Sequence, residues 1–437
     1  MKHQDEKVYP KEWACQPVAK PLLAVCPVPG SKSITNRALV LAALNSGNNP
    51  IILKGVLQSE DTEVMIQCLR DLGFSLNVNW TASEVIIQSP LAPGKIPAAK
   101  ANLFTANSGT TLRFLTAMVS LGQGNFRLDG IERMRERPVA DLLDALKQLG
   151  VQADCEKSNG CPPVIITSQG WKSAIASIKA ETSSQFLSGL LMAAPFAGLN
   201  VEINLEGQVV SQPYIDITLA MLRDWGFQIH QANSRQFLIQ GGQEGRIREY
   251  TIEPDASAAS YFFAAAAITG GKVTVPGLGK NSLQGDIHFA SLLGQMGCQV
   301  EMEQNQTTVI GGNLKGIDVD MNAISDTVMT LGVTACFAEG QTRIRNVAHI
   351  RHKETDRIRA MAVELGKLGA RVVEFGDGLQ IHPGNLRGAA IDTYNDHRIA
   401  MSFALASLKI PGMVIKDPGC VRKTYPDFFE DFEKAIG

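Results

Sequence analysis

The sequence predicts an α/β fold (α+β repeats) made of six similar units of about 70 residues, grouped as two domains. Two features that recur in phase along the whole chain predict it. The first is a helical pattern that ends in a Leu- or aromatic-rich turn and a glycine, and the second is an apolar, alanine-rich segment with a polar start. Repetition at a fixed period indicates that one supersecondary unit is used again and again.

The glycines define the period. They close the segments LRDLG, LKQLG, LRDWG, GQMG, GKLG and KAIG, and successive glycines lie 68 to 77 residues apart. A glycine in this position predicts a helix C-cap with left-handed backbone. The alternating segments that follow the first five, such as FSLNVNW, VQADC and CQVEM, predict a strand that leaves the cap.

The apolar segments predict helices that are buried inside their domains. They begin near residues 31, 107, 183, 255, 325 and 395, and they are apolar nearly all round, which leaves only their N-termini to meet a ligand. Three units precede residue 252 and three follow it. We therefore expect a discontinuous domain of residues 1–30 and 252–437, and an inserted domain of residues 31–251.

Composition excludes several classes of protein. A chain of 437 residues is too long for one core. The 41 Lys and Arg against 43 Asp and Glu give a net charge of −2, which argues against a general nucleic-acid or membrane-surface binder. The charged start MKHQDEKVYPKEW, the lack of a long apolar run and eight cysteines without a CxxC pair predict a cytoplasmic protein with buried free thiols and no metal.

The six helix starts differ in chemistry, and a purely structural repeat does not explain that difference. The first three supply hydrogen-bond donors suited to phosphate and hydroxyl groups: Lys32, Ser33, Arg37, Arg113, Ser183, Ser184 and Gln185. Cations oppose the partial positive charge of a helix N-terminus. An anionic ligand held by backbone N–H groups, serines and both cations explains them economically, and a solvated turn with incidental charges is the alternative.

The last three helix starts carry Asp255, Asp326 and Asp396. Aspartate at a helix start is ordinarily an N-cap, which is the interpretation that we favour for Asp255 and Asp396. For Asp326 a cap and a general base are both open.

Charged residues also lie between the repeats. In RERPV, Arg137 precedes a proline and is expected in extended backbone. In RHKETDRIRAM, Lys353, Glu354 and Arg357 fall in one predicted helix start, where a Glu354–Arg357 pair taken alone is typical of a surface ion pair. VRKTYP places Lys423 on a turn before a proline, and we assign no metal to HIRH (349–352).

Together these motifs resemble a known family. PGSKSITNR, NSGTTLR, RERP, SSQFLSGLLM, PYIDIT, SDT, KETDR, NDHR and KTYP occur in the order and approximate spacing of 5-enolpyruvylshikimate-3-phosphate (EPSP) synthases. The resemblance implies an enolpyruvyl transferase fold, with two domains of three βαβαββ units and the active site in the cleft between them. It implies transfer of the enolpyruvyl group of phosphoenolpyruvate to the 5-hydroxyl of shikimate 3-phosphate, without metal or organic cofactor, by a cytoplasmic monomer.

The resemblance also implies roles for single residues. Asp326 is similar to the family's base, Glu354 to its proton donor, and Lys32 lies close to both the phosphate and the transferring oxygen. The residues implied for shikimate 3-phosphate are Lys32, Ser33, Arg37, Ser183, Ser184, Gln185, Ser211, Asp326, His349 and Lys353. Those implied for phosphoenolpyruvate are Lys32, Gly109, Arg137, Gln185, Arg357, Arg398 and Lys423.

Three positions depart from the family pattern: His349 stands where many members have Asn, Gln212 where many have Lys, and Phe114 where many have Pro. Gly109 resembles members that glyphosate inhibits. The alternatives are a UDP-N-acetylglucosamine enolpyruvyl transferase, an enzyme like RNA 3′-phosphate cyclase, and a repeat scaffold without activity. The first would need a reactive cysteine in a mobile loop, and the second a histidine nucleophile and a basic surface.

Overall fold

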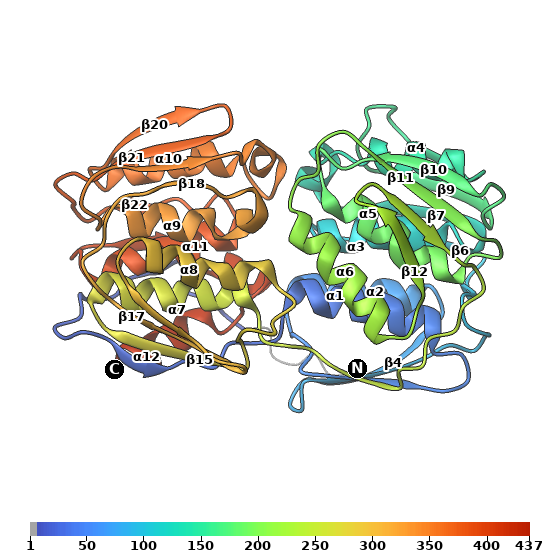
Figure 1. The fold of residues 1–437 in the computed structure, drawn as a ribbon, viewed down its shortest axis with the longest axis horizontal. Coiled ribbons are helices and arrows are strands. Elements are labelled where there is room, and N and C mark those ends of the chain that lie inside the picture. The colour runs from blue at the N-terminus through green and yellow to red at the C-terminus, as the bar shows by residue number, and fades with distance from the viewer. Residues whose placement is uncertain (1–6) are drawn as a thin grey trace. The chain divides into compact units, whose positions relative to one another are not determined.

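The computed structural model describes residues 7–437, so residues 1–6 of the charged N-terminal segment lie outside the described residues. The chain forms two compact units. The inserted unit is Gly30–Glu253, and the terminal unit combines the chain up to Pro29 with Pro254–Gly437. In Figure 1 the dark blue N-terminal segment belongs with the yellow to red part of the chain, because β2 (Leu23–Val25) pairs in parallel with β15 (Lys272–Pro276).

The division falls after Pro29 and after Glu253, within two residues of the predicted boundaries. Backbone hydrogen bonds account for the offset. The Ser31 N–H donates to the Glu253 carbonyl (2.9 Å) and the Ile252 N–H to the Lys54 carbonyl (2.8 Å), which ties residues 252 and 253 to the inserted unit.

The inserted unit contains six α-helices among its described residues. They are α1 (Lys32–Asn45), α2 (Glu60–Asp71), α3 (Gly109–Val119), α4 (Ala140–Gln148), α5 (Ser184–Ala193) and α6 (Gln212–Asp224). Its strands are β3 (Ile51–Lys54), β4 (Ser75–Asn79), β5 (Glu84–Gln88), β6 (Lys100–Phe104), β7 (Gln123–Asp129), β8 (Gln152–Cys155), β9 (Val164–Gln169), β10 (Ile175–Lys179), β11 (Val201–Glu206), β12 (Ile229–Asn233), β13 (Gln236–Ile239) and β14 (Glu249–Thr251).

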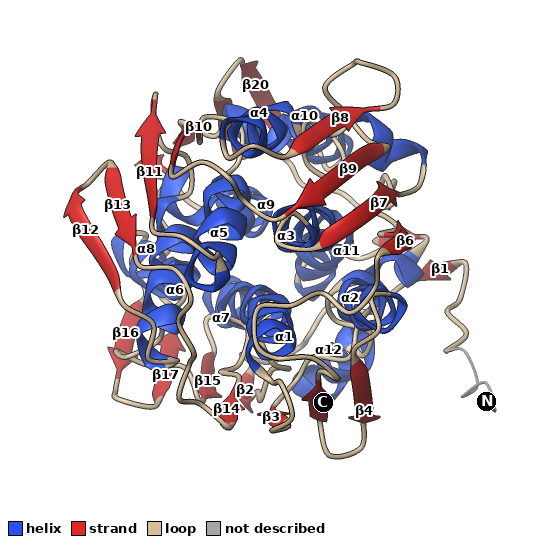
Figure 2. Ribbon diagram, turned by 90° about the vertical axis from the view of Figure 1, so that its right-hand side faces the viewer, coloured by secondary structure: helices blue, strands red, loops and turns tan. Residues whose placement is uncertain are grey.

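These strands form three four-stranded sheets of one design. Their orders are β14-β3-β5-β4, β6-β7-β9-β8 and β10-β11-β13-β12, and in each the first pair is parallel while the other two pairs are antiparallel. A parallel pair needs a crossover connection, which α3 supplies between β6 and β7 and α5 between β10 and β11. In each sheet the last two strands are consecutive in the chain, with no helix between them. Figure 2 shows α1, α3 and α5 inside the unit, with strands towards its outside.

The terminal unit repeats this design. Its helices are α7 (Ala256–Thr269), α8 (Phe289–Gln295), α9 (Val328–Ala335), α10 (Arg357–Lys367), α11 (His397–Ala404) and α12 (Phe428–Ile436). Its other strands are β1 (Glu12–Trp13), β16 (Gln299–Met302), β17 (Gln306–Ile310), β18 (Asp318–Asp320), β19 (Thr342–Arg345), β20 (Arg371–Phe375), β21 (Gly378–His382), β22 (Ala390–Ile391) and β23 (Val414–Lys416). The sheets are β16-β17-β15-β2, β18-β19-β21-β20 and a three-stranded sheet, β1-β23-β22.

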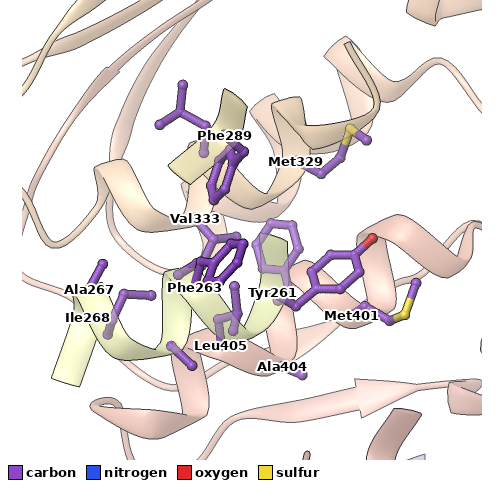
Figure 3. Packing of buried hydrophobic residues seen from close by; sticks show 14 of the residues in the cluster. Tyr261, Phe263, Ala267, Ile268, Phe289, Met329, Val333, Met401, Ala404 and Leu405 are labelled. Carbon is purple, nitrogen blue, oxygen red and sulfur yellow. The ribbon is translucent and has the colours of Figure 1, made fainter. Parts of the chain in front are cut away.

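The helices with polar starts are buried, as the sequence predicts. Every residue of α3 and of α7 is buried. Figure 3 shows how α7 contributes Tyr261 and Phe263 to a core that also contains Val333 of α9 and Met401 of α11. Only the N-terminal turns of such helices remain to form a site.

The periodic glycines act as predicted. Gly73, Gly150, Gly226, Gly297, Gly369 and Gly437 all have φ between 84° and 110°. This left-handed backbone favours glycine because a Cβ atom would be strained there. The strands expected after Gly73, Gly150 and Gly297 are β4, β8 and β16. All eight cysteines are free, but Cys15, Cys155 and Cys161 are only half-buried, which corrects the expectation that the thiols lie in the core.

Candidate active site

In the inserted unit, side-chain hydrogen bonds join the starts of the three inner helices. Asn36 of α1 donates to Thr110 Oγ1 of α3 (2.7 Å), and Arg113 of α3 donates to Gln185 Oε1 of α5 (2.6 Å). We call the predicted residues on and around these starts the serine–arginine cluster: Lys32, Ser33, Arg37, Gly109, Arg137, Ser183, Ser184, Gln185 and Ser211. The hydrogen bonds hold the three N-termini, each a potential anion site, in one arrangement.

Lys32 is the first residue of α1, where the helix dipole opposes a cation. Its ammonium group lies 3.4 Å from Asp61 Oδ2, and the Asp61 side chain is 3% exposed. A nearly buried carboxylate thus offsets part of the repulsion before any ligand arrives. The Lys32 side chain itself is 12% exposed, so its amine is at the margin of the unit. Sequence reasoning missed Asp61, which lies 29 residues away on α2.

Arg37 is buried, and its guanidinium group donates hydrogen bonds to other residues of the inserted unit. It donates to Thr218 Oγ1 (2.8 Å), the Ser33 carbonyl (2.8 Å), the Tyr214 carbonyl (2.9 Å) and Ser188 Oγ (3.3 Å). Burial lowers the pKa of Arg37 to about 10, so it stays charged at neutral pH. Its guanidinium carbon lies 5.1 Å from the ring centroid of Phe114, so the phenylalanine that replaces the usual proline stacks on this cation.

Arg137 lies across the start of α3. Its Nη1 donates to the Asn107 carbonyl (2.9 Å), and its backbone is extended, as predicted from the following proline. A Cβ atom added to Gly109 would lie 2.5 Å from Arg137 Nη2 and 3.1 Å from Arg113 Nη1. A side chain at position 109 would therefore displace the Arg137 guanidinium group and crowd that of Arg113.

The serines sit at helix starts. Ser183 is the N-cap of α5, and its side chain accepts from the Gln185 N–H (3.2 Å), while Ser184 is the first helical residue. Ser211 precedes α6 with left-handed backbone (φ 54°), an uncommon conformation for a residue other than glycine. Ser33 lies in the first turn of α1 and is half-buried.

In the terminal unit, one buried arginine gathers three carboxylates. Arg357, the first residue of α10, donates to Asp396 Oδ2 (2.8 Å), Asp326 Oδ1 (3.1 Å) and Glu354 Oε2 (2.8 Å). Burial lowers the pKa of Arg357, but the charges of the three carboxylates outweigh it and raise the pKa overall. The expected surface pair of Glu354 and Arg357 is wrong: their side chains are 7% and 1% exposed. The reason is that Asp326 and Asp396, distant in sequence, close over the arginine.

We call the predicted residues here the carboxylate cluster: Asp326, His349, Lys353, Glu354, Arg357, Arg398 and Lys423. Arg398 donates to Asp326 Oδ2 (2.8 Å), so both oxygens of Asp326 accept from guanidinium groups. Lys423 Nζ lies 3.9 Å from Glu354 Oε1. Cations and carboxylates thus alternate, which keeps each buried charge compensated.

The structure decides the cap assignments. Asp255 accepts from the Ala258 N–H (2.9 Å) and Asp396 from the Arg398 N–H (2.9 Å), so both are N-caps, as predicted. Asp326 is not the cap of its helix, because it lies in a 3₁₀ turn (Asn322–Thr327) and α9 begins only at Val328. Both oxygens of Asp326 bind arginines, an arrangement for a carboxylate ion, which is the form that a base requires.

Lys353 and Glu354 precede α10 rather than beginning it, which corrects the expectation of one helix start. Asp356 is the N-cap, accepting from the Arg359 N–H (3.0 Å). His349 is buried, and burial together with the charge of Lys353 lowers its pKa to about 3. A neutral imidazole at physiological pH can form hydrogen bonds with a substrate but adds no charge to the cluster.

Two residues that sequence reasoning did not single out complete this cluster. Ser257, in the first turn of α7, accepts from Arg398 Nη2 (3.4 Å) and donates to Asp286. Burial and the charge of Asp326 raise the pKa of Asp286 to about 7. Ser257 stands in the DASAAS segment, but nothing in its local sequence indicates that Arg398 would reach it. Among residues 7–437 no group of three or more His, Cys, Asp or Glu is arranged to hold a metal ion, and no helix is long and apolar enough to cross a membrane.

Comparison with known proteins identifies the relatives of this chain. The family model described as EPSP synthase (3-phosphoshikimate 1-carboxyvinyltransferase) matches residues 18–432. The chain is 49% identical over 419 residues to the 3-phosphoshikimate 1-carboxyvinyltransferase of Trichormus variabilis, covering 96% of this chain and 97% of that protein. The relative of that name from Marinomonas is 45% identical over 407 residues, covering 93% and 95%.

Solved structures show the same fold. EPSP synthase from Acinetobacter baumannii superimposes with a TM-score of 0.79 at 28% identity, covering 97% of this chain and 98% of that one. The enolpyruvyl transferase NikO from Streptomyces tendae has a TM-score of 0.75 at 20% identity, covering 97% and 96%, which shows a shared fold alone. The resemblance drawn from the nine motifs is confirmed: the chain belongs to the EPSP synthase family.

Proposed function

We propose that this protein transfers the enolpyruvyl group of phosphoenolpyruvate to the 5-hydroxyl of shikimate 3-phosphate, releasing phosphate, in aromatic amino acid biosynthesis. The observation that carries the proposal is the convergence of Arg357 and Arg398 on Asp326, with Glu354 on the same arginine. The reaction needs one base, one acid and cations for several anionic groups, and this group of side chains contains all three kinds.

Both predicted ligand sets stay proposals. Shikimate 3-phosphate would be held by the serines, Lys32, Arg37 and Gln185 of the serine–arginine cluster and by Asp326, His349 and Lys353 of the carboxylate cluster. Phosphoenolpyruvate would be held by Lys32, Gly109, Arg137 and Gln185 of the first cluster and by Arg357, Arg398 and Lys423 of the second. Guanidinium groups suit phosphate and carboxylate because they donate two parallel hydrogen bonds. Arg37 donates to the Ser33 and Tyr214 carbonyls and to two hydroxyl groups. It would therefore also hold in place the residues around the substrate.

The chemistry follows as addition and elimination. Asp326 would take the proton of the 5-hydroxyl group while the oxygen of that hydroxyl attacks C2 of phosphoenolpyruvate. Glu354 would protonate the methylene carbon. The tetrahedral intermediate then expels phosphate, whose charge Lys32 and the arginines stabilise. Loss of a proton from the methyl group restores the carbon–carbon double bond and gives the enol ether product.

Glu354 lies beside two cations, whereas an acid must carry a proton. Its carboxylate is paired with Arg357 (2.8 Å) and lies 3.9 Å from Lys423. Both cations are proposed ligands of phosphoenolpyruvate. When the substrate's phosphate and carboxylate take over these cations, Glu354 loses its compensation and its affinity for a proton rises. Substrate binding thus supplies the condition under which a glutamate can donate a proton.

The competing acceptor is UDP-N-acetylglucosamine, which the comparisons favour less. Purified protein with phosphoenolpyruvate should release inorganic phosphate when shikimate 3-phosphate is added, and none above background with UDP-N-acetylglucosamine. Release with the second acceptor only would overturn the proposal. We also propose a cytoplasmic monomer that glyphosate inhibits as an analogue of phosphoenolpyruvate, which sedimentation and inhibition assays would test.

A further inference from the structure

A strained turn at Tyr394 and Asn395 places Asp396, the N-cap of α11, next to the carboxylate cluster. Tyr394 and Asn395 have φ of 55° and 51°, so two consecutive residues other than glycine adopt left-handed backbone. Such a conformation is unfavourable for these residues and persists only where the surroundings hold it. The next residue is Asp396, which binds Arg357 and caps the helix that carries Arg398.

Glu364 of α10 holds the start of this turn. Its side chain is fully buried, and its Oε1 accepts from the Tyr394 hydroxyl at 2.6 Å. Its Oε2 accepts from the Asp392 N–H (3.1 Å) and pairs with Lys367 Nζ (2.7 Å). A buried carboxylate with three donors is compensated, so it can serve as a rigid support.

The same helix holds the end of the turn. Arg357 and Glu364 are two turns apart on α10, and Arg357 binds the carboxylate of Asp396 while Glu364 binds Tyr394 and Asp392. Residues 392–396 are therefore fixed to α10 at both ends. Their position determines where Asp396 places Arg357 and where Asp396 caps α11 by accepting from the Arg398 N–H.

We propose that Glu364 and Tyr394 are positioning residues for the two arginines that bind phosphoenolpyruvate. Neither is in the proposed ligand sets, and both act through the turn and Asp396. This inference rests on the proposed function for its kinetic consequence. Its structural consequence, a turn held by one tyrosine hydroxyl, does not depend on which substrates bind.

Tyr394→Phe tests the proposal, because it removes the hydroxyl and leaves the ring. Loss of one hydrogen bond to a buried carboxylate should raise the KM for phosphoenolpyruvate about 3- to 10-fold, with a smaller change in kcat and in the KM for shikimate 3-phosphate. Backbone hydrogen exchange in residues 392–400 should also become faster. The matched control is Tyr9→Phe, which removes a hydroxyl of the same unit that donates to the Pro426 carbonyl (3.1 Å).

A second variant separates positioning from folding. Glu364→Gln keeps an acceptor for Tyr394 but loses the charge opposite Lys367, and it should change the same KM in the same direction. The proposal is overturned if Tyr394→Phe lowers the melting temperature but leaves the KM for phosphoenolpyruvate and the exchange of residues 392–400 as in the control. An inactive wild-type protein would instead refute the proposed function, and faster exchange in Tyr394→Phe would still support the turn.

Discussion

At the scale of residues, the buried Arg357 of the carboxylate cluster is compensated by carboxylates, among them the cap Asp396. Arg357 is 1% exposed and Asp396 fully buried. Their pair therefore differs from exposed ion pairs, which contribute little to stability. Removing one partner of a buried pair costs about 3–5 kcal/mol, because the other charge remains without compensation. Variants that test chemistry should therefore keep shape and hydrogen bonding.

Asp326→Asn and Glu354→Gln come nearest to this condition, although each replaces one of the two carboxylate oxygens by an amide NH2 that cannot accept a hydrogen bond. Each keeps the shape of the side chain but cannot transfer the proton, so we expect turnover to fall roughly 10²- to 10⁴-fold. Calorimetric titration with shikimate 3-phosphate should still show binding, and circular dichroism an intact fold. Near-normal phosphate release by either variant would remove that residue from the acid–base pair.

Asp286 should make stability depend on pH. Its pKa is about 7 in the folded protein because it is buried and near Asp326, against about 3.9 in an unfolded chain. Between these values the folded state binds more protons, so this group's contribution to the free energy of unfolding falls as pH rises from about 4 to about 7. Above pH 7 it is constant.

Urea denaturation across this pH range, compared between wild type and Asp286→Asn, isolates that contribution. The free energy of unfolding of the wild type, relative to that of Asp286→Asn, should fall as pH rises and then become constant. A difference that does not vary between pH 4 and pH 7 would show that Asp286 is ionised throughout.

At the scale of elements, the site is made of helix starts whose interiors are buried. The N-terminus of α3 shows what this requires, since Gly109 leaves room for Arg137. Gly109→Ala should leave the fold intact and raise the KM for phosphoenolpyruvate more than the KM for shikimate 3-phosphate, because the added Cβ would lie 2.5 Å from Arg137 Nη2 and must displace it.

Steady-state kinetics with each substrate varied in turn would measure this effect. Gly198→Ala is a matched control in the same unit, because a Cβ there has no neighbour within 4 Å. Equal kinetic constants for Gly109→Ala and the control would mean that Arg137 does not bind phosphoenolpyruvate.

At the scale of the whole molecule, the proposed ligand sets draw on both units, so the two substrates should bind cooperatively. If the 5-hydroxyl of shikimate 3-phosphate takes up Asp326, Arg357 and Arg398 each lose an acceptor and can bind phosphoenolpyruvate. Shikimate 3-phosphate should then raise the affinity for phosphoenolpyruvate by a factor typical of coupled sites, about 5- to 150-fold.

Titration of the Glu354→Gln variant with phosphoenolpyruvate, with and without shikimate 3-phosphate, measures this coupling while turnover is slowed. Hydrogen exchange should slow both at the start of α1 and in residues 349–353 when shikimate 3-phosphate alone is added. Equal affinities under the two conditions would show that the substrates bind independently.

The sequence by itself determined the features that depend on neighbouring residues. Glycine caps, the aspartate caps at positions 255 and 396, the extended backbone at Arg137 and the buried alanine-rich helices all follow from local backbone preference and apolar periodicity. The family followed too, because its motifs are short segments in a fixed order.

Only the tertiary structure decided how charges are buried and paired. Glu354 and Arg357 read as a surface pair in sequence, yet Asp396, 39 residues from Arg357, helps to enclose them. Asp326 could be a cap or a base until its 3₁₀ turn and two arginine partners were seen. The physical reason is that desolvation and Coulomb interaction depend on distances in space between groups, which packing sets and which spacing along the chain does not reveal.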